Sequence, residues 1–67
     1  MQVRSKGEIA ALYMPDSSVE TARAYLSSWI KHNANLSDEL KATGYTPRAK
    51  LLTPKQIRII FHYLGEP

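Results

Sequence analysis

The chain has 67 residues, no cysteine and a formal net charge of +3 at pH 7, which allows one small domain (residues 1–67) and excludes disulfide bridges and thiolate metal sites. It has no long apolar run and no basic-then-apolar start, so we expect no membrane span, no secretory leader and a cytoplasmic location. At this size burial and chain entropy nearly cancel, so stability must come from dense helix packing or from a partner chain.

The N-terminal residues predict a short extended segment followed by a first helix. Residues 2–4 can pair with residues 50–52 in a two-strand ribbon, or they can form an unpaired end. Ser5 and Glu8 have the spacing of a capping box, and residues 6–13 follow as a helix. Gly7 in the first turn costs about 1 kcal/mol relative to alanine, which indicates that another segment packs closely there.

The segment 17–31 predicts the second helix, around which the rest of the chain is organised. We expect Ser17 to cap it together with Glu20, and Trp29 to form the centre of the core. The buried stripe consists of apolar side chains at helical spacing: Val19, Ala22, Leu26, Trp29 and Ile30. The opposite face consists of small side chains: Thr21, Ala24, Ser27 and Ser28. Such a face lets another surface approach the helix backbone closely.

The first two helices are joined by a short turn that contains Pro15 and Asp16. This outline fits a helix-turn-helix, and it fits a plain helical hairpin in a bundle equally well.

The second half of the chain predicts two more helices. Asn35 can cap a third helix over residues 36–43, which ends at Gly44. Pro47 then makes residues 45–52 irregular. The fourth helix has the clearest start, because Thr53, Pro54 and Gln56 supply a cap, a first-turn proline and a capping box.

The fourth helix runs to about Leu64 and ends at Gly65. Its apolar arc is wide, because Ile59 and Tyr63 lie beside the core-facing stripe. The helix is therefore either buried on two sides or presents a surface for contact with another chain.

The residues that carry chemistry do not predict an enzyme. His32 and His62 lie far apart, and each is better explained as a solvated or helix-capping side chain. No nucleophile, phosphate-loop or metalloprotease motif occurs, so we expect no cofactor, no metal site and no small-molecule substrate. Tyr45 could stack on a base or sugar, although covering a helix end after Gly44 is the favoured interpretation.

Positive charge is concentrated in the second half of the sequence. Residues 40–65 contain no acidic side chain, whereas the first 39 residues contain five acids and four bases. The bases of the second half are Lys41, Arg48, Lys50, Lys55 and Arg58. A one-sided basic surface is typical of a phosphate-binding protein, although such asymmetry also arises by chance in short chains.

Nearly the full length resembles a family of short proteins of gut bacteria known only as a domain of unknown function. The residues that carry the resemblance are Val3-Arg4-Ser5, Glu8-Ile9-Ala10, Leu12-Tyr13, Pro15-Asp16-Ser17, Thr21-Ala22, Leu26, Trp29-Ile30, Ala42-Thr43-Gly44-Tyr45, Thr53-Pro54 and Tyr63-Leu64-Gly65-Glu66-Pro67. This resemblance implies no particular activity.

A second resemblance covers part of the chain. Gly7-Glu8-Ile9-Ala10, Ser18-Val19-Glu20-Thr21, Arg23, Tyr25, Gly44-Tyr45, Thr53-Pro54 and Gln56-Ile57 look like the order of elements in MerR-type and excisionase-type winged helix-turn-helix domains. The resemblance implies that the second helix enters the DNA major groove, with Thr21 and Arg23 facing DNA and Arg48 and Lys50 on phosphates. The sequence departs from those families at residues 35–43, a predicted helix where they have a wing hairpin.

The sequence therefore predicts a mostly α, four-helix, helix-turn-helix-like domain that binds duplex DNA as a regulator or accessory factor. The candidate DNA-binding residues are Thr21, Arg23, Ser27, Lys31, Arg48, Lys50, Lys55 and Arg58. The alternative is a protein-interaction or homodimerisation module that uses the small face of the second helix and the flank formed by Ile59 and Tyr63.

Overall fold

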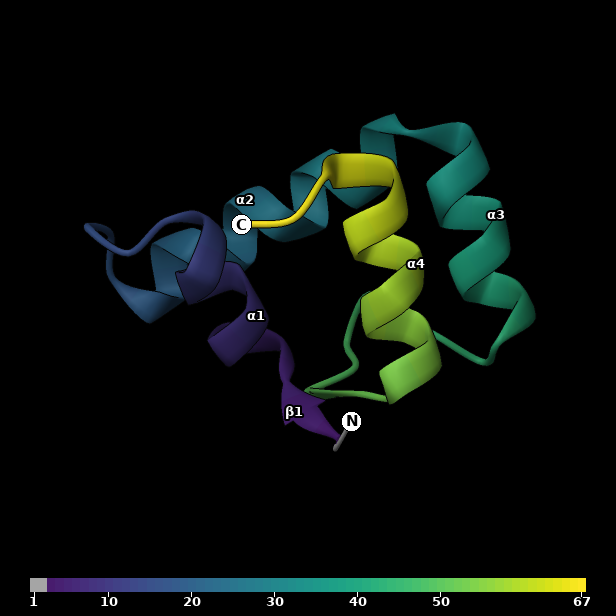
Figure 1. Cartoon of the computed structure of the whole chain (residues 1–67), viewed down its shortest axis with the longest axis horizontal. Coiled ribbons are helices and arrows are strands. Elements are labelled where there is room, and N and C mark those ends of the chain that lie inside the picture. Colours follow the sequence, from purple (N-terminus) through teal and green to yellow (C-terminus); the bar gives the residue numbers. More distant parts are fainter. Residues whose placement is uncertain (1–2) are drawn as a thin grey trace.

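A computed structural model describes residues 3–67 and shows a mostly helical chain with a short two-strand ribbon (Figure 1). The elements in chain order are β1 (Arg4–Ser5), α1 (Lys6–Tyr13), α2 (Val19–His32), α3 (Ala34–Ala42), β2 (Leu51–Leu52) and α4 (Pro54–Leu64). The predicted fold class of four helices and a ribbon is confirmed.

The ribbon joins the start of the chain to the segment before α4. It is antiparallel and pairs Arg4 with Leu52 and Ser5 with Leu51. The ladder continues into the first residue of α1, because the Lys6 backbone N–H donates to the Lys50 carbonyl oxygen at 2.8 Å. The strand was predicted over residues 2–4 and lies at Arg4–Ser5; Gln2 is outside the described residues.

Helix α1 has the predicted bounds and the predicted Ser5 cap, but the Glu8 carboxylate accepts from the Ser5 hydroxyl and not, as in a capping box, from the Ser5 backbone N–H. The Ser5 Oγ accepts from the Glu8 backbone N–H at 3.0 Å, and its hydroxyl donates to the Glu8 carboxylate at 3.3 Å. Gly7 lies against α2, where an added Cβ atom would stand 2.8 Å from Val19 Cγ1 and 3.3 Å from Arg23 Cδ. The close packing expected at Gly7 is therefore confirmed.

The caps of α2 and α3 differ from the prediction. The Ser18 Oγ caps α2 by accepting from the Thr21 N–H at 3.2 Å, so the predicted Ser17–Glu20 cap is wrong. Asn33, rather than Asn35, caps α3, because its Oδ1 accepts from the Leu36 N–H at 3.1 Å. The Asn33 N–H also donates to the Ile30 carbonyl and ends α2, so this one residue connects the two helices.

Helix α4 begins with the predicted capping box. The Thr53 Oγ1 accepts from the Gln56 N–H at 3.2 Å, and the Gln56 Oε1 accepts from the Thr53 N–H at 3.0 Å. Pro54 occupies the first turn, where a missing N–H leaves no helical hydrogen bond unmade. The helix ends at Gly65, whose positive φ of 86° is a conformation that favours glycine.

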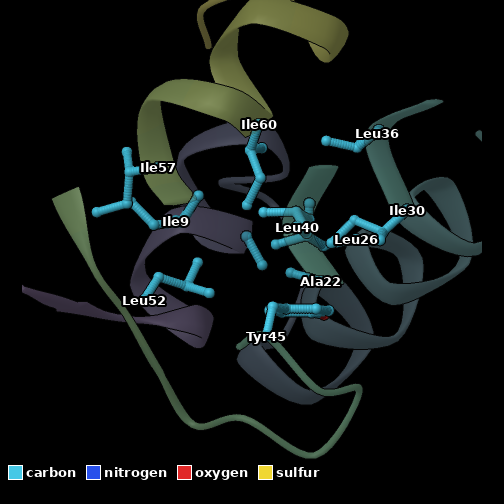
Figure 2. Packing of buried hydrophobic residues seen from close by; sticks show 11 residues of the cluster. Ile9, Ala22, Leu26, Ile30, Leu36, Leu40, Tyr45, Leu52, Ile57 and Ile60 are labelled. Carbon is cyan, nitrogen blue, oxygen red and sulfur yellow. The ribbon is translucent and has the colours of Figure 1, made fainter. Parts of the chain in front are cut away.

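The core lies between the four helices and β2 (Figure 2). Its largest fully buried side chains are Ile9, Leu26, Leu36, Leu40, Leu52, Ile57 and Ile60. Trp29 is only partly buried and packs on the outside of this cluster, with its ring edge-on to Tyr13 at 6.0 Å. The prediction that Trp29 forms the centre is therefore wrong, and Leu26 occupies that place on α2 (Figure 2).

The packing also decides two other predictions, which concern the burial of Val19 on α2 and of Ile59 and Tyr63 on α4. Val19, expected in the buried stripe of α2, is 52% exposed although one of its methyl groups lies close to Gly7, so this prediction is wrong. Ile59 and Tyr63 are half-buried and pack against the core, so the wide apolar arc of α4 is partly covered within the chain.

No helix within residues 3–67 has both the length and the apolar character needed to cross a membrane.

Candidate functional site

The small face of α2 remains accessible and is bordered by the loop between α3 and β2. Thr21 and Ala24 are exposed, and Ser27 and Ser28 are half-buried. Between α2 and this loop is a hollow of about 370 Å³. Its lining residues are Lys6, Glu20, Arg23, Ala24, Ser27, Pro47, Arg48, Ala49 and Lys50.

A second hollow of about 350 Å³ adjoins the first, because both are lined by Ser27 and Pro47. Its remaining lining residues are Ile30, Lys31, Ser37, Lys41 and Tyr45. We call the two hollows together the α2–loop groove. Its basic side chains are Lys6, Arg23, Lys31, Lys41, Arg48 and Lys50. Within the described part of the chain, Glu20 is the one acidic residue lining either hollow.

Lys6 holds the loop in place beside α2. Its Nζ donates to the Tyr45 hydroxyl at 2.7 Å and to the Pro47 carbonyl oxygen at 3.3 Å. Its backbone N–H donates to the Lys50 carbonyl oxygen, as part of the ribbon. Lys6 thus contacts the loop at Tyr45, Pro47 and Lys50. Arg48 lies between Pro47 and Lys50 in the sequence.

Both side chains of the Lys6–Tyr45 hydrogen bond are buried, with 3% and 7% of their surfaces exposed. Burial lowers the pKa of Lys6, and the nearby positive charge of Arg23 lowers it further. Burial also raises the pKa of Tyr45. Because the Tyr45 ring belongs to the core, it has little surface on which a base could stack (Figure 2).

The structure brings five of the eight predicted site residues together at the α2–loop groove: Arg23, Ser27, Lys31, Arg48 and Lys50. Thr21 is exposed on α2, but its Oγ1 accepts from the Ser18 hydroxyl at 2.9 Å as part of the helix cap. Lys55 and Arg58 are exposed on α4 and line neither hollow.

Sequence reasoning missed two basic residues of the groove. Lys41 belongs to the basic second half of the sequence and lies in the last turn of α3. Both features are visible in the sequence and could have placed Lys41 among the candidate site residues. Lys6 carried no local signal, because its burial depends on a loop about forty residues further along the chain.

The histidines occupy the roles that the sequence favoured. The His32 Nδ1 lies 2.8 Å from the Ser28 carbonyl oxygen, within the last turn of α2. His62 is exposed on α4, with its ring edge-on to Tyr63. Within residues 3–67, no three His, Cys, Asp or Glu side chains gather in a way that could hold a metal ion.

Comparison with known families matches residues 1–67 to a family that is described as a domain of unknown function (DUF4248). The chain belongs to this family. No curated protein and no solved structure matched the chain. Membership in DUF4248 confirms the first resemblance at the level of the family, and it assigns no activity, so function must be argued from the groove itself.

Proposed function

We propose that this DUF4248 chain binds nucleic acid, in the first place duplex DNA, with the phosphate backbone lying in the α2–loop groove. The supporting observation is the concentration of charge: six basic side chains and one acidic side chain line the groove. Neutralisation of phosphates by lysine and arginine supplies most of the affinity of non-sequence-specific nucleic-acid binding.

The groove is better suited to contacts with the backbone than with base edges. Ala24 and Ser27 keep the middle of the α2 surface low, so a strand can approach the helix closely. Arg23 and Lys31 are the α2 side chains lining the groove that can form the bidentate contact typical of guanine recognition, and neither is paired with an Asn or Gln that would read adenine. We therefore propose an accessory or regulatory protein with weak base preference.

Salt-dependent binding to a fluorescently labelled duplex tests this proposal. Fluorescence anisotropy between about 50 and 200 mM salt gives the dependence of the binding constant on salt concentration. At physiological salt the expected Kd is about 10⁻⁶ to 10⁻⁴ M, the range of ordinary non-specific binding.

The chain offers a matched pair of variants for this experiment. The double variant Arg48→Gln with Lys50→Gln removes one arginine and one lysine charge from the groove. The control variant Lys55→Gln with Arg58→Gln removes one charge of each type from α4. We expect the groove variant to lower the salt slope by about 0.9 for each phosphate that is no longer neutralised. The α4 variant should have a smaller effect. Equal losses in both variants, or no salt-dependent binding below about 100 μM, would contradict the proposal.

The alternative function, a protein-interaction or homodimerisation module, has one favourable observation. Val19 and Tyr25 on α2 are each about half exposed, and Leu12 on α1 is similarly open to solvent. Analytical ultracentrifugation across protein concentration separates the two functions. A species of 7.6 kDa at all concentrations fits the DNA-binding proposal, whereas a tight dimer that does not bind DNA supports the alternative.

A further inference from the structure

The buried ammonium group of Lys6 lacks a negative partner among its hydrogen-bond acceptors. Its Nζ donates to a phenol oxygen and to a peptide carbonyl oxygen, both of which are neutral. These bonds use two of the three N–H bonds of the ammonium, and the Nζ also lies 5.2 Å from the centroid of the Tyr45 ring. Lys6 also lines the larger hollow of the groove.

We propose that this hollow is a discrete site for one phosphate group, bound by the Lys6 ammonium and the Arg23 guanidinium. Arg48 and Lys50 approach the same hollow from the loop and supply further positive charge. This proposal rests on the proposed function and deepens it, because it fixes one point on the chain where a phosphate is held.

The charges around the hollow favour an anion at this position. Lys6 and Arg23 lie close enough to repel one another, and an anion between them replaces that repulsion with two attractions. Burial of a charge is costly unless it is paired, and a phosphate oxygen would supply the missing pair. Arginine adds bidentate geometry, which suits a tetrahedral phosphate.

The other groups facing Lys6 do not supply the missing charge. Glu20 lines the same hollow on α2, but the Nζ of Lys6 donates elsewhere. The Tyr45 hydroxyl remains protonated at neutral pH, because burial raises the pKa of Tyr45. Arg48 and Lys50, like Arg23, are positive.

Titration with two phosphate probes, followed by NMR of the backbone amides, tests the site. The probes are inorganic phosphate and the dinucleotide TpT, each measured against chloride at constant ionic strength. We expect both probes to shift amides in residues 20–27 and 46–50. Tighter binding of TpT identifies a nucleic-acid phosphodiester as the preferred ligand, and tighter binding of inorganic phosphate identifies a free phosphate.

Three variants decide whether Lys6 and Arg23 carry the binding. Arg23→Gln, an exposed position that should fold normally, is expected to weaken phosphate binding about tenfold, as for loss of a hydrogen bond to a charged group. Lys6→Met should remove the site, and Lys55→Gln should leave it unchanged.

The phosphate site and the DNA-binding function can fail separately. Phosphate shifts confined to other residues, or insensitive to Arg23→Gln, would overturn the site even if DNA still binds. Because the Arg23→Gln measurement is decisive by itself, the site remains testable if Lys6→Met does not fold. Phosphate binding at the hollow without any DNA binding would uphold the site and overturn the proposed function.

Discussion

The Gln56 Nε2 donates to the Thr43 Oγ1 at 2.9 Å and so connects the start of α4 to the end of α3. The same Gln56 side chain completes the capping box of α4, and the Thr43 hydroxyl donates in turn to the Leu40 carbonyl oxygen at 2.6 Å. These bonds join the first residue of the loop that carries Arg48 and Lys50 to the first turn of α4. We therefore expect two polar residues outside the α2–loop groove to help hold its loop in place.

Replacement of Thr43 by valine tests this connection. Thr43→Val removes the hydroxyl and leaves the Gln56 amide donor without its acceptor, so we expect a loss of about 1–2 kcal/mol in the free energy of unfolding. Thr46→Val, in an exposed position of the same loop, should change it by less than about 0.5 kcal/mol. Urea denaturation measures both. Equal stability of the two variants would mean that the hydrogen bond contributes nothing.

The contact between Gly7 and Val19 predicts a rescue. Gly7→Ala gains helix propensity, but its Cβ would stand 2.8 Å from Val19 Cγ1, and overpacking typically costs about 1–3 kcal/mol. We expect Gly7→Ala to be destabilised, and the added Val19→Ala substitution to restore stability, because it removes the obstructing methyl group. A double-mutant cycle measures the coupling between the two positions. Additive effects would show that the contact can relax.

The lowered pKa of Lys6 predicts a dependence of stability on pH. Between that lowered pKa and 10.5, the unfolded chain binds more protons than the folded chain, so the free energy of unfolding rises with pH. Lys6→Met should lack this rise. The raised pKa values of Tyr13, Tyr45 and Tyr63 act in the opposite direction, and only above about pH 10.

Denaturation curves from neutral pH to pH 10 therefore isolate the contribution of Lys6. The difference between the unchanged chain and Lys6→Met is the quantity to compare, since other groups titrate in both proteins. A difference that stays constant over this range would contradict the inferred burial of the charge.

Ala24 provides a test of the groove that does not alter its basic residues. Ala24→Glu adds an acid to the α2 surface, and Ala24→Gln adds a side chain of similar size without charge. Because Ala24 is exposed, both should change stability by less than about 0.5 kcal/mol. We expect Ala24→Glu to bind duplex DNA several-fold more weakly than Ala24→Gln in the anisotropy assay. Indistinguishable binding by the two variants would place the DNA elsewhere.

The accuracy of the sequence prediction follows the local chemistry of each helix start. Thr53, Pro54 and Gln56 allow one arrangement, and the start of α4 was predicted correctly. At α2 and α3 two chemically equivalent caps lie within two residues, Ser17 or Ser18 and Asn33 or Asn35. Local rules cannot separate such pairs, because tertiary packing sets the register of each helix.

The candidate site was predictable only where its residues belong to a pattern that is visible in the sequence. The excess of basic residues after Leu40 is visible in the sequence, and Arg48 and Lys50 do lie beside α2. The burial of Lys6 depends on ribbon pairing and on Tyr45, which is 39 residues away, so it leaves no periodic pattern. Trp29 misled the prediction because a residue at the margin of a helical stripe looks the same in sequence as one at its centre.

The corner at Asn33 limits how the length of this chain can vary. A single residue both ends α2 and begins α3, and Leu36 and Leu40 follow it into the interior. One inserted residue would turn the following helix by about 100° and carry both leucines away from their neighbours. Insertions and deletions among relatives should therefore avoid this corner and collect in the exposed segment 46–48, where they would reshape the groove without disturbing the interior.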